Sequence, residues 1–428
     1  MTSYDKGGFT MKPITAILLG AGSRGTYIFG GYATKYPLHL KFIAVAEPNE
    51  EKRAIFAAAH GIPTEQCFAT WEEALSQGKV ADAAVICTQD HMHFAPSMKA
   101  LSLGYHIMLE KPMATSEEEC IQLEAASREH NRLLMLSHVL RYTQFWSAIK
   151  KIIAGKEIGK IVHIQLTENV GHQHMAHSYV RGNWRNTTVS SPIVLAKSSH
   201  DLDILSWLMD QPASRLSSFG SLMHFREDQA PEGSTARCTD GCAVERSCPY
   251  SAIRIYLEEK KPHFSIHLAP DPTLDNRLHA LHNGPYGRCV YRCDNNVMDH
   301  QVVNLEFKDG ATAAFTLTGF TAKTTRTLHI TGTQGEITGD MSEDWLSVNL
   351  FSTGQTNTYR FVNDEDSHGG GDEGYIAAFI HEVRSFDERK DASRTGLTSA
   401  QASLQSHMLA FAAEKSRLQN GTPIHFNW

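Results

Sequence analysis

Cysteine is scarce in this chain, with eight residues in 428. So low a content excludes a small secreted scaffold that is held together by disulfides. No apolar run is long enough to span a bilayer, and the run at 16–19 is too short for the core of a signal peptide. We therefore expect a cytoplasmic protein without a membrane segment.

An excess of one charge is also missing, because 40 Lys and Arg residues stand against 47 Asp and Glu residues. No basic block stands out, so we do not expect binding to nucleic acid. Hydrophobic residues make up 41% of the chain and charged residues 20%, as in ordinary globular proteins. This composition excludes a disordered, collagenous or coiled-coil chain.

The first third of the chain alternates short apolar runs with helical patterns. Strands are expected at 14–19, 40–46, 82–87, 106–109 and 133–138, and helices at 23–32, 50–59, 94–103 and 116–130. Strands that alternate with helices predict an α/β domain with a doubly wound parallel sheet of the Rossmann type.

After about residue 140 the pattern becomes β-rich and alternates polar with apolar residues, as in one-sided antiparallel strands. Strands are expected at 161–168, 215–222, 302–307, 311–317, 326–331 and 345–350, and helices at 145–153, 193–207, 375–386 and 399–417. We predict a flexible tail at 1–10, a dinucleotide-binding domain at 11–140, and an α+β domain with an open mixed or antiparallel sheet at 141–428.

A glycine-rich turn follows the first expected strand. Gly20-Ala-Gly22-Ser23-Arg24-Gly25 has the GxGxxG spacing that lets a pyrophosphate approach backbone N–H groups at a helix start. Glu47 ends the second strand, where a carboxylate accepts hydrogen bonds from a ribose 2′-hydroxyl and repels a 2′-phosphate. These features favour NAD over NADP, although Arg53 lies close behind Glu47 in the sequence.

Two further stretches complete a family pattern. Thr88-Gln-Asp90-His-Met-His93 follows the third strand, and Glu110-Lys111-Pro112 follows the fourth. Together with the glycine turn and the segment 158–161, they resemble the Gfo/Idh/MocA oxidoreductase family. That resemblance implies a Rossmann domain followed by an open mixed sheet, and oxidation or reduction of a secondary carbinol in a sugar or cyclitol. The residues expected to bind the cofactor are Gly20, Gly22, Ser23, Arg24, Gly25, Glu47, Thr88, Asp90, His93, Glu110 and Lys111.

The resemblance also implies catalytic residues. The family's EKP lysine lies near the substrate hydroxyl and the nicotinamide, so this role falls to Lys111. His200 matches the family's catalytic histidine, but Ala196 stands where family dehydrogenases often carry an Asp, one helical turn earlier. Lys197 is a candidate for a second cationic contact or part of the proton relay, and Asp201 or Asp203 for the group that orients His200.

The segment 171–185 is dense in histidine, arginine and aromatic residues. Aromatic rings stack on the apolar face of a sugar, and Arg and His donate hydrogen bonds to hydroxyls. The predicted substrate contacts are Lys111, His177, Tyr179, Arg181, Trp184, Arg185, Lys197, His200 and His368. A metal site on His172, His174 and His177 is a weaker alternative, because no acidic or Cys partner lies within the run.

Near the C-terminus, His368-Gly-Gly-Gly-Asp372 precedes an expected helix. Two interpretations stay open here: His368 faces the active site, or the segment is a simple helix start with Asp372 as its cap.

Five cysteines gather between 238 and 293 in an insertion at about 230–300. Cys238, Cys242, Cys248 and Cys293 suit a structural zinc site, although the spacing between Cys242 and Cys248 is not that of a standard knuckle. Free thiols are an equal alternative, and disulfides a weaker one in a reducing compartment.

The sequence thus predicts an NAD-dependent oxidoreductase that acts on a CH–OH group of a sugar, glycoside or cyclitol. One alternative is a redox-neutral enzyme that holds NAD tightly, oxidises a sugar transiently and eliminates a neighbouring group. Another is a regulator that senses NAD or sugar without catalysis, which the retained EKP lysine disfavours. By the resemblance, we also expect a homodimer or homotetramer.

Overall fold

The computed structural model describes residues 12–258, 262–269, 271–361, 368–389 and 396–428, so the expected tail at 1–10 lies outside the described residues. Six strands form the first sheet in the order β3-β2-β1-β4-β5-β6, and all its pairs are parallel. The predicted doubly wound Rossmann sheet is confirmed. Its strands are β1 (Ile14–Leu19), β2 (Leu40–Ala46), β3 (Cys67–Phe68), β4 (Ala83–Ile86), β5 (His106–Leu109) and β6 (Leu134–Leu136).

Helices bury both faces of this sheet. One face packs on the helical turns η1 (Arg24–Gly30) and α1 (Gly31–Lys35), on α2 (Glu50–His60) and on α12 (Gly371–Arg389). The opposite face packs on α3 (Trp71–Ser76), α4 (Phe94–Ser102), α5 (Glu117–Glu129) and α13 (Ala400–Leu418). Local chemistry sets the helix limits: the Asn49 side chain caps α2 through Lys52 N at 2.9 Å, and Gly61 ends it with φ +62°.

Nine strands form the second sheet, which is mixed because β7 and β10 are parallel while the other pairs are antiparallel. Buried residues alternate along β9, so one face of the sheet is covered and the other is open. The predicted second sheet is confirmed. Its strands, in order across the sheet, are β14 (Gln355–Arg360), β13 (Trp345–Leu350), β12 (Gly335–Asp340), β11 (Thr325–Gly332), β7 (Ile161–Asn169), β10 (Thr312–Thr318), β9 (His300–Phe307), β8 (Ala213–Ser221) and β15 (Ile424–His425).

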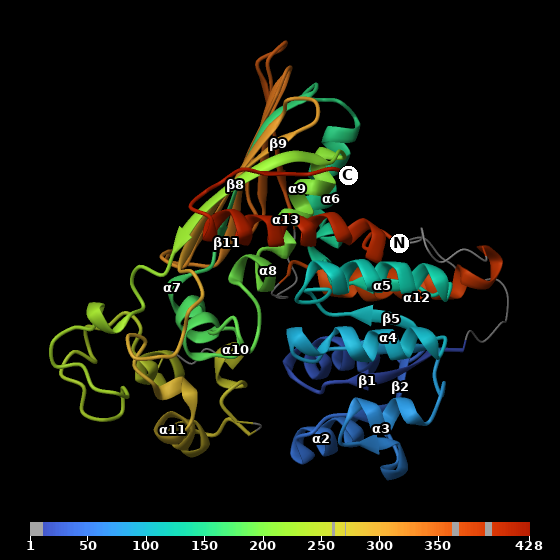
Figure 1. Ribbon diagram of the computed structural model, residues 1–428, viewed down its shortest axis with the longest axis vertical. Coiled ribbons are helices and arrows are strands. Elements are labelled where there is room, and N and C mark those ends of the chain that lie inside the picture. The colour runs from blue at the N-terminus through green and yellow to red at the C-terminus, as the bar shows by residue number, and fades with distance from the viewer. Residues whose placement is uncertain (1–11, 259–261, 270, 362–367, 390–395) are drawn as a thin grey trace.

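The C-terminal helices tie the two sheets together. In Figure 1, α13 runs beside α5 at one end and beneath β8 at the other, and residues of α13 contribute to the cores of both sheets. His407 of α13 accepts a hydrogen bond from Met113 N at 2.8 Å, directly after the EKP tripeptide. The predicted dinucleotide half of the chain is therefore packed against helices from the far end of the sequence.

One expected helix, at 193–207, is interrupted. The structure has α8 (Ile193–Ala196) and α9 (Ser199–Met209), with Lys197 and Ser198 between them. Ser198 and Ser199 are weak helix formers, and Ser198 adopts φ −87° and ψ 3°. The Ala196 carbonyl at this break accepts a hydrogen bond from Lys111 Nζ, which follows β5.

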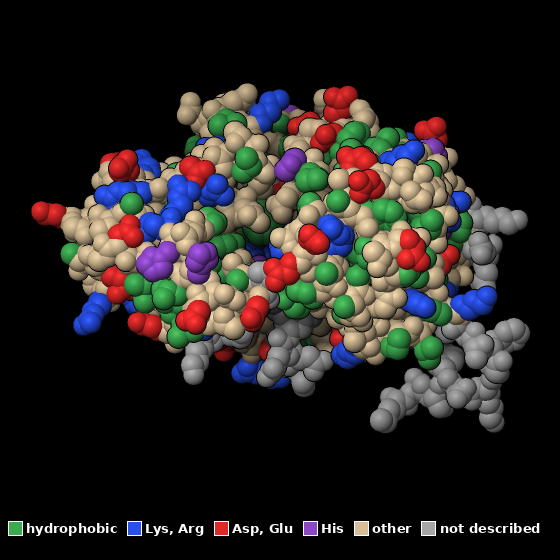
Figure 2. Space-filling model, turned by 90° about the horizontal axis from the view of Figure 1, so that it is seen from below, with side chains coloured by type: hydrophobic (Ala, Val, Ile, Leu, Met, Phe, Trp, Pro, Cys, Tyr) green, Lys and Arg blue, Asp and Glu red, His purple; other side chains and the backbone are tan. Residues whose placement is uncertain are grey.

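The insertion at about 230–300 forms its own small core around Tyr256, Phe264 and Leu281. It contains η7 (Arg254–Glu258), α10 (Pro262–Ser265), α11 (Leu274–Asn283) and η8 (Pro285–Gly287), and Figure 1 shows it beneath one end of the second sheet. On the face in Figure 2, acidic and basic side chains are interspersed. Within the described ranges, no helix combines the length and the apolar character needed to cross a membrane.

Candidate active site

The glycine-rich turn joins β1 to the helical turn that follows it. Gly20 has φ +96°, and a Cβ there would lie 2.7 Å from the Cys87 carbonyl oxygen. A Cβ on Gly25 would lie 2.3 Å from the Gly20 carbonyl oxygen, so this position holds the turn against the helix. Gly22 differs, because nothing lies within 4 Å of a Cβ built there. The open side of Gly22 fits the close approach of a dinucleotide pyrophosphate.

Glu47 closes this turn from the neighbouring strand. Its carboxylate accepts hydrogen bonds from Ala21 N at 2.8 Å and from Asn49 N at 3.0 Å, and its side chain is buried. Arg53 turns its guanidinium to the Glu47 backbone carbonyl, at 2.5 Å, rather than to the carboxylate. The carboxylate thus stands beside the glycine turn, at the position of a ribose-binding acid.

Lys111 follows β5 at the carboxyl edge of the first sheet, where open α/β sheets bind ligands. The Lys111–Pro112 peptide bond is cis. Lys111 Nζ donates to the Ala196 carbonyl at 2.6 Å, across the break between α8 and α9. Burial lowers the pKa of the Lys111 ammonium, while Asp90 and Glu110 oppose this shift. A buried lysine of this kind is prepared to exchange a proton.

His200 lies in the first turn of α9, close enough to Lys111 to feel its charge. Burial lowers the pKa of the His200 imidazole well below its usual value, and Lys111 and His138 add to the effect. Among the described residues, His200 Nδ1 has no hydrogen-bond partner. His200 is therefore neutral. Ala196, four residues earlier, has no carboxylate to offer the ring, unlike the Asp that family dehydrogenases often carry at this position.

The expectation that Asp201 or Asp203 orients His200 is wrong. Asp201 accepts from Arg326 Nε at 2.7 Å, and Asp203 accepts from Arg141 through both of its oxygens at 2.7 Å. Asp201 is one position along the helix and points in a different direction from His200, whereas Asp203 is one turn along but is held by Arg141. Both carboxylates neutralise buried arginines instead.

A second layer of charge supports the pocket. Glu168 on β7 lies 2.6 Å from Arg326 and 3.2 Å from Lys197. Glu168 and Arg326 face each other across β7 and β11 in the sheet register. Sequence reasoning missed both residues, although a charged residue at an inward position of an otherwise apolar strand was a usable signal. Lys197 is thereby held by a carboxylate at the edge of the site.

The loop after β4 connects the two domains. Asp90 accepts hydrogen bonds from Trp184 Nε1 at 3.1 Å and from the hydroxyls of Ser190 and Ser191 at 3.0 and 2.7 Å. His93 lies within hydrogen-bond distance of the Pro112 carbonyl at 2.6 Å and the Thr88 carbonyl at 3.1 Å. Asp90 and His93 thus fix the EKP loop and the segment 184–191 relative to each other.

The predicted substrate contacts separate into two groups. Tyr179 and Trp184 lie near the charged groups of the pocket, and burial, followed by Glu168, raises the pKa of the Tyr179 hydroxyl. The other three predicted contacts in the segment 171–185 bond to residues near or in the insertion instead. His177 Nδ1 lies 2.8 Å from the Tyr256 hydroxyl, Arg181 donates to the Tyr250 and Arg288 carbonyls, and Arg185 pairs with Asp294.

His368 reaches the same pocket from the C-terminal part of the chain. Its ring centroid lies 6.0 Å from that of His200, and its Nδ1 lies 2.9 Å from Asp372 Oδ2. Asp372 also accepts two hydrogen bonds from Arg24, at 2.6 and 3.0 Å. Arg24 in turn donates to Glu110 at 2.7 Å. Asp372 therefore belongs to a charged network and does more than begin a helix.

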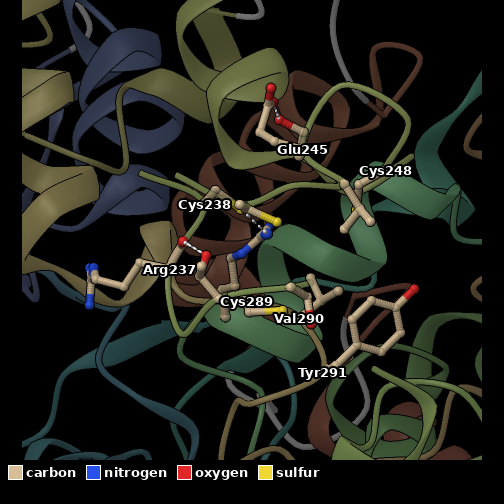
Figure 3. A pocket seen from close by; sticks show the side chains of 13 residues that line it. Arg237, Cys238, Glu245, Cys248, Cys289, Val290 and Tyr291 are labelled. Atoms are coloured by element: carbon tan, nitrogen blue, oxygen red, sulfur yellow. Dashed lines mark hydrogen bonds between the residues drawn. The ribbon is translucent and has the colours of Figure 1, made fainter. Parts of the chain in front are cut away.

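Four of the five cysteines between 238 and 293 line a small pocket in the insertion. Within the described ranges, no three His, Cys, Asp or Glu side chains are grouped to hold a metal ion, so the zinc prediction for Cys238, Cys242, Cys248 and Cys293 and the weaker histidine alternative are unsupported. Figure 3 shows the pocket, which Cys238, Cys242, Cys248 and Cys289 line. The Arg181 guanidinium enters it, with Nη2 3.8 Å from Cys238 Sγ. Cys293 Sγ instead lies 3.3 Å from the Cys289 carbonyl. A cation from outside the cysteine-rich segment thus already lies among the thiols, which are free.

Known proteins resemble both halves of the chain. Residues 14–138 match the family model described as "Oxidoreductase family, NAD-binding Rossmann fold", and residues 150–402 match "Oxidoreductase family, C-terminal alpha/beta domain". The putative oxidoreductase YteT of Bacillus subtilis is 22% identical over 68% of this chain and 70% of its own length.

Two other proteins extend this comparison. A 2,7-anhydro-N-acetylneuraminate hydratase of Mediterraneibacter gnavus is 23% identical over 46% of this chain, and the match spans only 50% of that protein. An inositol dehydrogenase homolog of Azotobacter vinelandii, solved with NAD+, shares the fold with a TM-score of 0.71 and 14% identity. That similarity covers 97% of this chain and 98% of the other.

Proposed function

Because the chain belongs to the Gfo/Idh/MocA oxidoreductase family, we propose that it exchanges hydride between NAD and a secondary carbinol of a sugar, glycoside or cyclitol. The observation that carries the proposal is the buried Lys111 ammonium, held beside the neutral His200 at the carboxyl edge of the Rossmann sheet. Oxidising an alcohol needs a group that takes the hydroxyl proton, and this pocket provides two.

The glycine turn and Glu47 would hold the cofactor. Gly22 offers open space for the pyrophosphate, and the Glu47 carboxylate would bind the ribose hydroxyls that NAD carries. A 2′-phosphate at that place would meet a buried carboxylate, which supports NAD over NADP. NAD+, when bound, accepts the hydride that leaves the carbinol carbon.

Lys111 and His200 handle the hydroxyl proton. A lysine whose pKa is lowered by burial has a larger neutral fraction at physiological pH and can accept a proton. His200 is neutral for the same reason and serves as the second acceptor or as a hydrogen-bond donor to the substrate oxygen. In the reductive direction, the group that holds the proton returns it to the carbonyl oxygen.

Tyr179, Trp184 and Lys197 are the proposed substrate contacts on the second domain. The two aromatic rings lie 6.4 Å apart between centroids, and they offer apolar faces beside polar groups, as sugar rings require. Lys197 presents a cation that Glu168 holds in place. His177, Arg181 and Arg185 support this surface from behind, through the insertion.

A redox-neutral reaction is the second candidate, and the hydratase relative favours it. In this route the sugar is oxidised transiently, the ketone acidifies a neighbouring C–H bond, and the hydride later returns to the substrate. Such a route needs a further base beside the first, and His368 lies next to His200.

The absorbance of NADH distinguishes these reactions. Purified full-length protein receives free NAD+ and a panel of sugars, glycosides and inositols, while chromatography follows the loss of each compound. Sustained growth of NADH with one compound supports the net dehydrogenase. Loss of a compound without net absorbance change supports the redox-neutral route, and neither signal across the panel argues against both.

Cytoplasmic location and a homo-oligomeric state stay predictions. The open face of the nine-stranded sheet is the surface that an oligomer would use. Light scattering on the purified protein measures the mass directly, and a mass of about one 47.6 kDa chain would contradict the expected oligomer.

A further inference from the structure

Ala196 leaves His200 without a carboxylate partner four residues earlier in the chain. A histidine from another part of the chain can take over part of the proton transfer. His200 Nδ1 is buried and has no hydrogen-bond partner among the described residues, so no carboxylate fixes its tautomer. A histidine that exchanges protons during catalysis usually has a partner that orients its ring and stabilises its charged form. Two histidine–carboxylate pairs flank His200 among the described residues: His138 with Asp203, and His368 with Asp372. Only the second has a histidine in contact with solvent, because the His138 side chain is fully buried and the His368 side chain is not.

We propose that His368, oriented by Asp372, relays the substrate's hydroxyl proton between the Lys111–His200 pocket and solvent. The inference rests on the proposed function and names the route by which the proton leaves. Asp372 is the positioning residue and His368 the relay residue. His368 lies in the turn before α12, four residues ahead of Asp372, and this turn, with positive φ at Gly369 and Gly370, brings the two side chains together.

The geometry supports each step of this path. The rings of His200 and His368 lie 6.0 Å apart between centroids, a separation that one bridging water spans. The His368 side chain is 27% exposed, whereas Asp372 is 3% exposed. The relay therefore has one end in the buried pocket and the other in contact with solvent.

The charges around Asp372 keep it ionised. Burial acts to raise the pKa of the Asp372 carboxyl, but Arg24 and His368 more than offset it, so the pKa lies well below its usual value. An ionised Asp372 at His368 Nδ1 favours a proton on Nδ1 and leaves Nε2 as the acceptor. His368 can then take a proton on Nε2 while Asp372 stabilises the resulting charge.

The overall reaction balances with this route. In oxidation, the carbinol C–H bond breaks with its electron pair, which reduces NAD+, and the O–H bond breaks to form the carbonyl. The released proton passes to Lys111 or His200, then to His368, and finally to water. In reduction each transfer runs backwards, so His368 supplies the proton.

Imidazole rescue tests the relay. In the NAD-loaded protein, we expect His368→Ala to lower kcat about 10²-fold with little change in KM, and free imidazole to restore much of the loss. Asp372→Asn should lower kcat in the same direction without imidazole rescue. His381→Ala is the matched control, because His381 lies exposed on the same helix. Unchanged kcat in His368→Ala, or a loss that imidazole does not restore, would overturn the relay.

A ¹⁵N NMR measurement of histidine-labelled, NAD-loaded protein tests the dyad without turnover. We expect neutral His368 to carry its proton on Nδ1. The groups that face these two rings are Asp372, Arg24, Lys111, His138 and Arg326. A proton on Nε2 of neutral His368, or a spectrum that Asp372→Asn leaves unchanged, would overturn the assignment.

The two failures are distinguishable. If the wild-type protein reduces NAD+ with a sugar and Lys111→Met does not, the proposed function stands whatever His368→Ala does. If no compound is turned over, the proposed function fails, and the NMR measurement alone still decides whether Asp372 orients His368.

Discussion

Two buried arginines, one beneath the candidate active site and one in the cysteine-rich insertion, have different kinds of partner. Arg326 lies beneath the candidate active site and is paired with Glu168 at 2.6 Å and Asp201 at 2.7 Å. Arg181 lies among the cysteines, where it donates hydrogen bonds to two backbone carbonyls and lies 3.8 Å from the Cys238 thiol. Among the described residues, Arg181 Nη1 has no hydrogen-bond partner.

The difference indicates different tasks for the two regions. Around Lys111 and His200, every nearby arginine is matched by carboxylates, so the field in the pocket is set by fixed ion pairs. Because the arginines and carboxylates stay charged, Lys111 and His200 are left as the groups that exchange protons. In the insertion, Arg181 instead crosslinks the segment that carries Tyr179 to the backbone of the insertion, which is a structural role.

The largest effect is expected from the catalytic pocket. Lys111→Met should lower kcat/KM about 10²–10⁴-fold, because the group that takes the hydroxyl proton is removed. NAD affinity, measured by calorimetry, should change little. Lys99→Met is the matched control, since Lys99 is exposed on α4, and it should retain wild-type turnover. Full activity in Lys111→Met would place proton transfer elsewhere.

Arg326→Met tests the paired arginine. The substitution leaves Glu168 and Asp201 buried with Lys197 as their remaining cation, and it should lower the free energy of unfolding by about 3–5 kcal/mol. Urea denaturation provides the measurement. The exposed pair of Arg215 with Glu306 is the control, where Arg215→Met should cost less than about 1 kcal/mol. Equal losses in the two variants would remove the distinction.

Arg181→Met should cost less than Arg326→Met. It removes hydrogen bonds to neutral acceptors and leaves no carboxylate uncompensated, so we expect a loss of about 1–3 kcal/mol in the same urea experiment. A loss larger than that of Arg326→Met would show that the thiols beside Arg181 carry negative charge in the folded protein.

Low pH should lower the free energy of unfolding, because Asp203 becomes protonated. Burial acts to raise its pKa, but Arg141 and His138 hold the pKa at about 2. Because this folded value is below that of an unfolded Asp, the stabilisation of about 2 kcal/mol is present above about pH 4 and is lost as the pH falls toward 2. The difference in unfolding free energy between wild type and Asp203→Asn should therefore shrink over that range. A constant difference would contradict the assignment.

The smallest effect is expected from zinc. Because the Arg181 guanidinium lies among the cysteines, adding Zn²⁺ to the reduced protein should leave Tm unchanged within error. Cys242→Ser should behave in the same way. A rise in Tm with one equivalent of Zn²⁺, abolished by Cys242→Ser, would restore the metal interpretation.

Much of the fold could be predicted because local patterns determine it. The limits of β1, β2 and β5 match the predicted ranges residue for residue, since strands buried on both faces form nearly continuous apolar runs. The break at Lys197 could not be predicted in this way, because the Ala196 carbonyl at the end of α8 bonds Lys111, which lies 85 residues earlier in the chain.

The site shows the same limit. The glycine turn, Glu47 and Lys111 are local motifs, and the sequence placed them on the correct loops. The pairing of Glu168 with Arg326 depends on the register of β7 and β11, which lie more than 150 residues apart in the chain. The zinc prediction is unsupported, and the sequence could not show that Arg181 enters the cysteine pocket from another segment.

The most direct test of the account follows deuterium from the carbinol carbon of the best substrate to the cofactor. Mass spectrometry of the recovered cofactor measures the transfer in a single turnover of wild type and Lys111→Met. The account predicts one deuterium in the reduced cofactor of the wild type and none in Lys111→Met over the same time. Conversion of the substrate by the wild type without deuterium reaching the cofactor would contradict it.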